Sequence, residues 1–421
     1  MVEYLRQMIK VFKFGGASIK NVESIKNVGE ILQQYDSDNL IIVFSAMGRV
    51  TNMLEEVVEA YVLQNKKSTV ALQKVKDFHA AILNELFAET HPVYNVVNNL
   101  FIEIEWVLEE KPNQDYAYDY DQIVSIGEFL STQIMSAYLQ QIGFENSWKD
   151  ARDLIRTDNT YRNAKIDWEI TIDLISTSIK EKHTITQGFI GCTSENFTTT
   201  LGREGSDFTA AIFAYCLDAK EVVIWKDVPG MMNADPKYFE KAQLLNQISF
   251  DEAIELAFFG AKVMHPKTIQ PLKKKNIPLR IKSFFHPSNE GTIIKEGVSN
   301  ANIPSFIVKE NQVLISISEV NLAFIVENHM SQIFSILAKN RVGVNLMQNS
   351  AISFSICVDN DKHKIPQLIE DLKVFFEVLC DKNLSLFTLR HYTKKSVEQF
   401  LHNKNVVLEQ RSCNTLQFIA R

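Results

Sequence analysis

The start of the chain has the order strand, helix, strand, and this order constrains the fold more than any other feature. Residues 9–14 and 40–44 are short, mostly apolar runs, and residues 21–34 between them have the spacing of an amphipathic helix. Strands this apolar are typical of a sheet that is buried on both faces, and parallel strands need crossover helices. The sequence therefore predicts an α/β fold, a three-layer αβα sandwich with a mostly parallel sheet.

The length of 421 residues predicts more than one domain, because a single core seldom grows beyond about 250–300 residues. We expect the first domain, residues 1–295, to close after Pro287 and Gly291. From there the pattern changes to short strands and helices. Residues 303–380 fit a βαββαβ-type unit, and residues 381–421 fit a second, shortened copy of it.

The first domain is also expected to contain long helical segments. Residues 52–110 are poor in Gly and Pro, and residues 122–139 predict one further helix. Residues 220–225 predict a strand. Ser249 and Glu252 match a capping box in front of an apolar helix.

The overall composition argues against several classes of function. A net charge of −7 argues against a nucleic-acid partner, which needs a basic surface. No apolar run reaches the ~18 residues of a membrane span, so we expect no membrane partner. The five cysteines are scattered and no signal peptide precedes the first strand, so we expect a reduced, cytoplasmic protein. The histidines lack zinc-ligand spacing, so no metal held by the protein is predicted.

Two polar segments carry the residue types that phosphoryl transfer requires. Residues 13–16 (Lys-Phe-Gly-Gly) follow the first strand, and residues 202–207 (Gly-Arg-Glu-Gly-Ser-Asp) open a helix. Glycine N–H groups and a helix N-terminus bind phosphate, and a lysine neutralises charge on the transferred group. Each segment alone has an ordinary structural explanation, as a turn, a surface lysine or a helix cap.

Two later segments, residues 225–236 and 259–266, complete a set of four. In order and spacing the four resemble the motifs of the aspartate kinases, here the monofunctional form with C-terminal ACT domains, within the amino-acid kinase superfamily. The resemblance implies the amino-acid kinase fold and ATP-dependent phosphorylation of L-aspartate to 4-phospho-L-aspartate, the first step towards lysine, threonine and methionine. It also implies that Mg²⁺ enters with ATP, and that the ACT-like units form a homodimer or higher homo-oligomer.

The resemblance implies a role for each matching residue. The catalytic residues it implies are Lys13 and Asp207. The substrate-binding residues it implies are Ser45, Thr51, Glu128, Arg203 and Ser206. The nucleotide-binding residues it implies are Lys13, Gly15, Gly16, Lys226, Asp227, Lys237 and Lys262. Charge supports two of these roles, because the ammonium group of aspartate needs a carboxylate such as Glu128, and its carboxylate suits the fork of Arg203.

Three positions depart from the motifs of the family. Ala17 stands in place of threonine, which leaves Ser18 as the hydroxyl of the loop. Glu204 stands in place of glycine, and Lys226 stands in place of threonine. Together they motivate one alternative, a catalytically weakened regulatory or binding protein. A second alternative is another amino-acid kinase with a carboxylate acceptor, such as acetylglutamate kinase or glutamate kinase.

A further departure lies in the tail. In lysine-inhibited aspartate kinases, acidic residues of the first ACT unit hold the ammonium groups of the effector within the pattern V-D-L-x-x-x-S-E-V. Residues 344–352 match this pattern with Asn345 in place of aspartate and Ala351 in place of glutamate. A buried cation without a paired carboxylate is costly to desolvate. The resemblance therefore predicts weak or absent inhibition by lysine.

Overall fold

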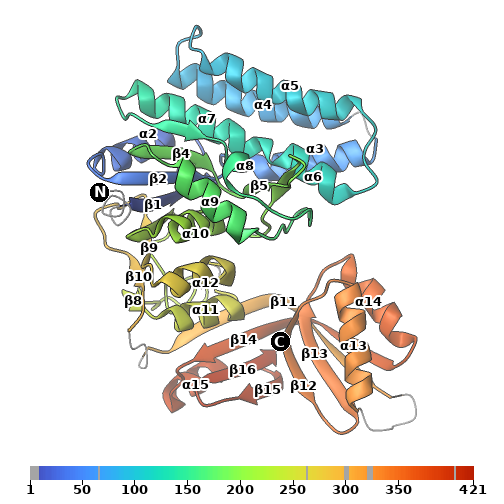
Figure 1. Cartoon of the computed structure of the whole chain (residues 1–421). Helices are drawn as coiled ribbons and strands as arrows, with labels where there is room; N and C mark the ends of the chain where they lie inside the picture. Colours follow the sequence, from blue (N-terminus) through green and yellow to red (C-terminus); the bar gives the residue numbers. More distant parts are fainter. Residues whose placement is uncertain (1–8, 65–66, 262–263, 298–302, 320–325, 403) are drawn as a thin grey trace. The chain divides into compact units, whose positions relative to one another are not determined.

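The computed structural model describes residues 9–421 apart from 65–66, 262–263, 298–302, 320–325 and 403. The chain forms two compact units (Figure 1). The first holds the described residues up to 231, together with 244–257 and 264–297. The second holds 232–243, 258–261 and the described residues from 303 onwards.

The first unit is built on an eight-stranded sheet with the order β3-β4-β2-β1-β7-β9-β10-β8. Every neighbouring pair is parallel except β9 and β10. The mostly parallel sheet predicted from the apolar strands is therefore confirmed. The strands are β1 (Ile9–Phe14), β2 (Asn39–Phe44), β3 (Ser147–Lys149), β4 (His183–Gln187), β7 (Glu221–Lys226), β8 (Gln247–Ile248), β9 (Leu279–Ser283) and β10 (Thr292–Ile294).

Helices cover both faces of this sheet, which makes the three predicted layers. Helices α2 and α7 lie on one face, and α9 and α10 lie on the other (Figure 1). A hairpin of β5 (Ile190–Cys192) and β6 (Thr198–Thr200) stands apart from the main sheet. The helices are α2 (Val22–Gln33), α3 (Val50–Val62), α4 (Lys67–Leu86), α5 (Val93–Glu109), α6 (Tyr116–Val124), α7 (Ile126–Gln141), α8 (Ala151–Leu154), α9 (Trp168–Ser178), α10 (Gly205–Leu217), α11 (Phe250–Phe259) and α12 (Pro266–Lys275), with a 3₁₀ turn η1 (Gly16–Ile19).

One predicted helix is divided in two. The segment expected as one helix over residues 122–139 forms α6 and α7, which meet at Ser125. The Ser125 hydroxyl donates a hydrogen bond to the carbonyl of Gln122 (3.2 Å), and its N–H donates to the carbonyl of Asp121 (3.4 Å). Serine competes for local backbone groups in this way and so favours helix ends. At Ser249, the hydroxyl accepts a hydrogen bond from the N–H of Glu252, as expected for a cap.

Stacked aromatic side chains hold the three central strands together. Parallel pairing of β2, β1 and β7 places Phe14 opposite both Phe44 and Trp225. The ring centroids of Phe14 and Trp225 are 5.8 Å apart with parallel planes, and those of Phe14 and Phe44 are 5.5 Å apart. Such pairs contribute about 0.5–1.5 kcal/mol each beyond the burial of their area. The ends of these strands are thus a rigid base for the polar segments that follow them.

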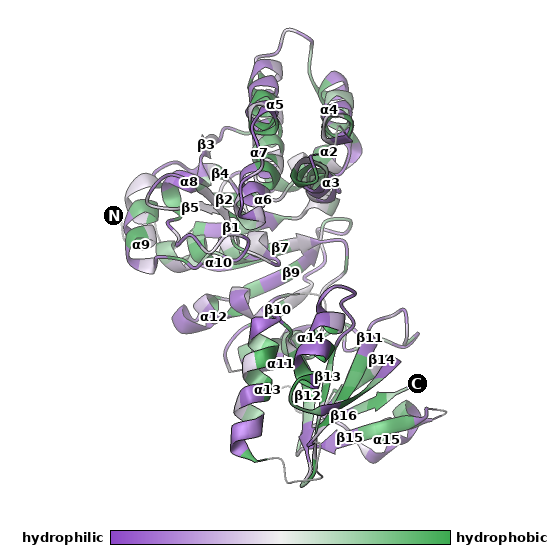
Figure 2. Ribbon diagram, turned by 90° about the vertical axis from the view of Figure 1, so that its right-hand side faces the viewer, coloured by the Kyte–Doolittle hydropathy of each residue, from purple (hydrophilic) through white to green (hydrophobic). Residues whose placement is uncertain are grey.

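The second unit is built on a six-stranded antiparallel sheet with the order β12-β13-β11-β14-β16-β15. Its elements alternate as in the predicted ACT-like tail, and its strands carry many hydrophobic residues (Figure 2). β14 pairs with both β11 and β16, so the two halves share one sheet. The division between 380 and 381 falls within β14, and these domain limits stay a prediction. The elements are β11 (Ser305–Ser318), α13 (Glu327–Lys339), β12 (Val344–Asn349), β13 (Ser353–Asp359), α14 (Lys364–Lys373), β14 (Glu377–Arg390), α15 (Lys394–Leu401), β15 (Val406–Arg411) and β16 (Thr415–Ala420).

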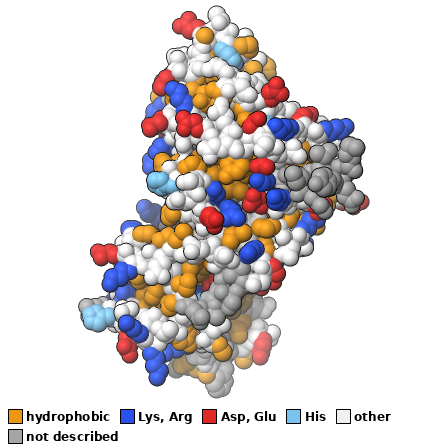
Figure 3. All heavy atoms as spheres, turned by 90° about the vertical axis from the view of Figure 1, so that its left-hand side faces the viewer, with side chains coloured by type: hydrophobic (Ala, Val, Ile, Leu, Met, Phe, Trp, Pro, Cys, Tyr) orange, Lys and Arg blue, Asp and Glu red, His pale blue; other side chains and the backbone are white. Residues whose placement is uncertain are grey.

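The surface offers no large field of one charge on the face shown in Figure 3, where basic and acidic side chains are interspersed. Among the helices that the structure describes, none combines the length and the apolar character that crossing a membrane requires.

Candidate active site

A polar pocket of about 400 Å³ lies in the first unit, beside the carboxyl ends of β1, β2 and β7. Ligands of open α/β sheets bind at this edge of the strands. Its lining brings together segments that are far apart in the sequence: Lys13, Ser45, Thr51, Tyr120, Glu128, Arg162, Phe189, Thr200, Gly202, Arg203, Glu204, Gly205, Ser206, Asp207 and Lys226. Both predicted catalytic residues and all five predicted substrate-binding residues are among them.

Two lysines form ion pairs with one buried carboxylate, and all three side chains line this pocket. Lys13 Nζ lies 2.6 Å from Asp207 Oδ1, and Lys226 Nζ lies 3.1 Å from Asp207 Oδ2. Lys13 is on β1, Lys226 ends the neighbouring β7, and Asp207 is in the first turn of α10. Burial alone would raise the pKa of Asp207, but the two ammonium groups outweigh it and hold this pKa below its ordinary value. Asp207 therefore stays ionised and fixes both cations at the pocket.

The glycine pair after β1 allows two loops to approach closely. A Cβ on Gly16 would lie 2.6 Å from the carbonyl oxygen of Ala46, and the N–H of Gly48 donates to the carbonyl of Gly16 (3.0 Å). A Cβ on Gly15 would lie 3.3 Å from Lys13 Nζ. Ser18, expected as the loop hydroxyl, is buried, and its Oγ donates to the carbonyl of Gly15 (2.6 Å). Its hydroxyl thus closes the turn.

Glu128 supplies a second buried carboxylate, on the first turn of α7. Only 2% of the residue is exposed, and its Oε1 accepts a hydrogen bond from the N–H of Ala46 (3.3 Å). Within the described part of the chain, Oε2 has no hydrogen-bond partner. Burial raises the pKa of Glu128 to about 8. A buried oxygen left without a partner is costly, and this atom is available to a donor on a ligand.

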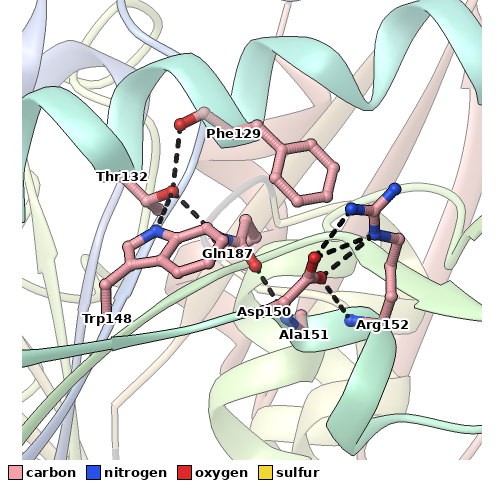
Figure 4. A network of polar contacts seen from close by, with 7 residues as sticks. All are labelled: Phe129, Thr132, Trp148, Asp150, Ala151, Arg152 and Gln187. Carbon is pink, nitrogen blue, oxygen red and sulfur yellow. Dashed lines mark hydrogen bonds and ion pairs between the residues drawn. The ribbon is translucent and has the colours of Figure 1, made fainter. Parts of the chain in front are cut away.

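A network of hydrogen bonds holds the helix that carries Glu128 in place (Figure 4). At its centre is Thr132, whose Oγ1 donates to the carbonyl of Glu128 (2.8 Å). The same oxygen accepts from Trp148 Nε1 (3.0 Å) and from Gln187 Nε2 (2.9 Å). Gln187 ends β4, and its Oε1 accepts from the N–H of Ala151 (2.7 Å). The network ties α7 to β3, β4 and α8, and so positions the Glu128 carboxylate.

The start of α10 presents a hydroxyl and a guanidinium to the same pocket. Ser206 is buried, and a Cβ on Gly188 would lie only 2.5 Å from the Cβ of Ser206. Glycine after β4 is therefore required for α10 to approach the sheet. Arg203 is exposed at the pocket edge, where its fork is open to a ligand.

Glu204 also faces this pocket, in the left-handed conformation with φ of 54°. Its Oε2 is buried and has no hydrogen-bond partner among the described residues. Burial raises the pKa of Glu204, against the attraction of Lys226. The two charged departures from the motifs, Glu204 and Lys226, thus lie in one pocket with opposite charges. Their charges offset each other, so the net charge of the pocket matches that of a site with neutral residues at both positions.

Residues 8–283 match the sequence profile of the Amino acid kinase family, which is well over half of the chain. The chain belongs to the amino acid kinase family. Aspartokinases are among its similar relatives. It is 30% identical over 405 residues to "Aspartokinase 3, chloroplastic" of Arabidopsis thaliana, covering 91% of this chain and 72% of that protein. It is also 30% identical over 393 residues to "Lysine-sensitive aspartokinase 3" of Escherichia coli (strain K12), covering 90% and 86%.

Solved aspartokinase structures are similar to this amino acid kinase over nearly its whole length. E. coli aspartokinase III in complex with aspartate and ADP (R-state) has 28% identity and a TM-score of 0.86, covering 98% of this chain and 96% of that chain. The same enzyme in complex with lysine and aspartate (T-state) has 28% identity and a TM-score of 0.81, covering 98% and 95%. The predicted fold, with its C-terminal βαββαβ-type units, and the resemblance to monofunctional aspartokinases are confirmed.

Two predicted nucleotide-binding residues of this amino acid kinase lie outside the pocket, and a third is not among the described residues. Asp227 follows β7 and is exposed, and it is not among the residues that line the pocket. Lys237 belongs to the second unit, where its Nζ lies 3.5 Å from Glu310 Oε2. Lys262 lies outside the described residues. Their roles, like those of Gly15 and Gly16, stay predictions.

Four residues of the pocket were not found by sequence reasoning: Tyr120, Arg162, Phe189 and Thr200. Phe189 comes two residues after the end of β4, so its place at the carboxyl end of a parallel strand was a usable signal. Nothing in the local sequence marks Tyr120 or Arg162. Within the described part of the chain, no group of three His, Cys, Asp or Glu side chains could hold a metal ion.

Proposed function

We propose that this amino acid kinase transfers the γ-phosphoryl group of ATP to the side-chain carboxylate of L-aspartate, giving 4-phospho-L-aspartate and ADP. The observation that carries the proposal is the unpartnered, buried Oε2 of Glu128 in the same pocket as Arg203 and the two lysines on Asp207. An acceptor with one ammonium and two carboxylate groups satisfies this set of charges. The complex of E. coli aspartokinase III with aspartate and ADP supports the same substrates.

The reaction needs charge stabilisation more than acid–base chemistry. A carboxylate oxygen of aspartate bonds to the γ-phosphorus while the bond from that phosphorus to the β,γ-bridging oxygen breaks, and the electron pair leaves with ADP. The side-chain carboxylate is already ionised at neutral pH, so no general base is required. Lys13 and Lys226, held by Asp207, stabilise the charge on the transferred group. Mg²⁺ would enter with ATP, where it neutralises phosphate charge.

The structure also bears on the alternatives. Acetylglutamate has no free ammonium group, so it offers no cationic partner to the buried Glu128. Lys13 and Asp207 keep an ion pair of 2.6 Å, which argues against a catalytically weakened protein. Glutamate differs from aspartate by one methylene group, which a pocket discriminates only about 10–200-fold. Glutamate kinase is therefore the rival that must be tested directly.

Trapping the acyl phosphate as a hydroxamate tests the proposal. With ATP and Mg²⁺ we expect hydroxamate from L-aspartate at a kcat/KM at least tenfold above that from L-glutamate, and none from N-acetyl-L-glutamate. A preference for either of the other acceptors would replace the proposed substrate. No product from any of the three would favour the regulatory alternative.

Three further expectations remain proposals: a cytoplasmic enzyme, a catalytic domain that ends near residue 295, and a homodimer or higher homo-oligomer formed through the ACT-like tail. Size-exclusion chromatography with light scattering tests the last of these.

Glu204→Gly should leave kcat/KM for aspartate unchanged or raise it. Glycine suits the left-handed backbone at this position, and its introduction removes a negative charge next to Lys226 and an anionic substrate. The measurement is kcat/KM for aspartate beside the thermal midpoint of unfolding, which should not fall. A tenfold drop in kcat/KM would show that Glu204 takes part in the reaction.

Lysine should inhibit this enzyme weakly or not at all. The Asn345 amide is already engaged in the second unit: its oxygen accepts from Lys309 Nζ (2.9 Å), and its nitrogen donates to Gln312 Oε1 (2.8 Å) and Asp359 Oδ1 (2.9 Å). An ammonium ligand there would meet an amide in place of a carboxylate. Titration of lysine and threonine, singly and together, against kinase activity is the measurement. Strong inhibition at micromolar lysine would contradict the prediction.

A further inference from the structure

One wall of the pocket is formed by Arg162, which has a left-handed backbone with φ of 65°. Its guanidinium lies over the ring of Tyr120, 4.4 Å from the centroid, and 5.4 Å from the centroid of Tyr116. The Tyr120 hydroxyl donates in turn to Glu55 Oε1 (2.8 Å), on the helix α3 that also carries Thr51. The guanidinium is thus stacked in a fixed place beside the predicted acceptor site.

A buried carboxylate fixes the backbone that carries this side chain. Asp121 is fully buried, and its Oδ2 accepts from the N–H of Arg162 (3.0 Å) and from the N–H of Thr200 (2.8 Å). The Thr200 hydroxyl donates to the other oxygen of Asp121 (2.7 Å). On its far side, the carbonyl of Arg162 would lie 3.1 Å from a Cβ on Gly202, the residue before Arg203. The loop is therefore anchored to α6, to β6 and to the segment that leads into α10.

The positive charge of Arg162 is not neutralised by an ion pair with a described residue. Among the described residues, no carboxylate forms an ion pair with its guanidinium, whereas Arg152 pairs with Asp150 at 2.7 Å. A left-handed backbone is costly for a residue with a side chain, and such outliers gather at functional sites. A stacked, unpaired guanidinium in a pocket is suited to bind an anion, and a carboxylate fits its fork.

We propose that Arg162 is a specificity-determining residue that binds the α-carboxylate of the acceptor, so that the acceptor site has two guanidinium groups, those of Arg162 and Arg203. This inference rests on the proposed function. The site of phosphoryl transfer lies at Lys13 and Lys226, at the ends of β1 and β7, whereas Arg162 belongs to the wall formed by α3, α6 and the 158–165 loop. The acceptor carboxylate that does not react is therefore the anion assigned to Arg162.

Arg162→Gly is the main test, because glycine adopts the left-handed backbone without strain, so the fold should be retained. Arg162→Lys keeps the charge without the fork. Lys165→Gln removes a charge from the same loop and is the matched control. The two acceptors are L-aspartate and L-aspartate α-amide, which lacks the α-carboxylate. KM is measured for aspartate and ATP, and the α-amide is also measured as a competitor of aspartate, so that it is informative even if it is not turned over.

Arg162→Gly should raise KM for aspartate about tenfold to hundredfold, the usual effect of losing a hydrogen bond to a charged group. The constant for the α-amide should change less than threefold, KM for ATP should not change, and Arg162→Lys should recover part of the loss. Lys165→Gln should behave as the wild type. Equal losses for aspartate and its α-amide, or no loss for aspartate, would overturn the inference. A rise in KM for ATP alone would assign Arg162 to the nucleotide phosphates and overturn it also.

The failure of this inference can be told apart from the failure of the proposed function. If the wild type forms no acyl phosphate from aspartate, the proposed function fails. Calorimetric binding of aspartate without ATP then still compares the wild type with Arg162→Gly. Equal affinities in that experiment would overturn the role of Arg162 by themselves.

Discussion

Lys13→Ala should lower kcat for aspartate-dependent ADP formation by about 10²–10³-fold, the usual effect of removing one donor that stabilises a transition state. Lys13 Nζ is held 2.6 Å from Asp207 at the end of β1, beside the glycine pair. Its removal takes away a fixed positive charge from the place where the phosphoryl group moves. The variant should stay folded, because Lys226 still pairs with the buried Asp207.

The same strand offers a matched control. Lys10 also lies on β1, but its Nζ pairs with Asp38 (2.8 Å), and it is not among the residues that line the pocket. Lys10→Ala should therefore keep the wild-type kcat. Far-UV circular dichroism and the thermal midpoint of both variants report folding. An unchanged kcat in folded Lys13→Ala would reject the catalytic role of this lysine.

Glu128→Gln should raise KM for aspartate about a hundredfold and leave KM for ATP within threefold, because a buried carboxylate that meets an ammonium group contributes several kcal/mol to binding. Glutamine keeps the size of the side chain, and its oxygen can still accept from the N–H of Ala46. Truncation of Arg203 should act in the same direction, since it supplies the opposite charge. Equal effects on both KM values would point to a disturbed fold.

The raised pKa of Glu128 also predicts a pH dependence. With a pKa of about 8 in the free enzyme, this carboxyl is mostly protonated at pH 7. Binding of an ammonium group requires the ionised form, so aspartate binding releases a proton, and affinity rises with pH up to about 8. Between pH 6 and 7.5, KM for aspartate should fall up to tenfold per pH unit in the wild type and stay flat in Glu128→Gln. Calorimetry in two buffers of different ionisation enthalpy measures the proton release, and none would contradict the assignment.

Local sequence patterns predict those strands and helices whose formation depends on neighbouring residues. β1, β2 and β7 were predicted because their apolar runs have no stable place except inside a sheet, and the helices around them follow from their own spacing. The chemistry of the strand ends is also local. Lys13 follows Val11 and Phe12 of β1 and lies two residues before a pair of glycines, and residues 203–207 lead into α10, so the polar character of both segments follows from the local sequence.

The α/β class, the lysine near the end of β1 and the polar start of α10 follow from local patterns. Contacts between these residues depend on how the strands and helices pack. The ion pairs of Asp207 with both Lys13 and Lys226 required β7 to pair with β1, although the two strands are more than 200 residues apart. The burial of the Glu128 oxygen depends on the elements packed around α7, and the backbone of Arg162 is held by Asp121. Burial and pairing depend on contacts between distant segments, whereas strand and helix patterns depend on residues a few positions apart.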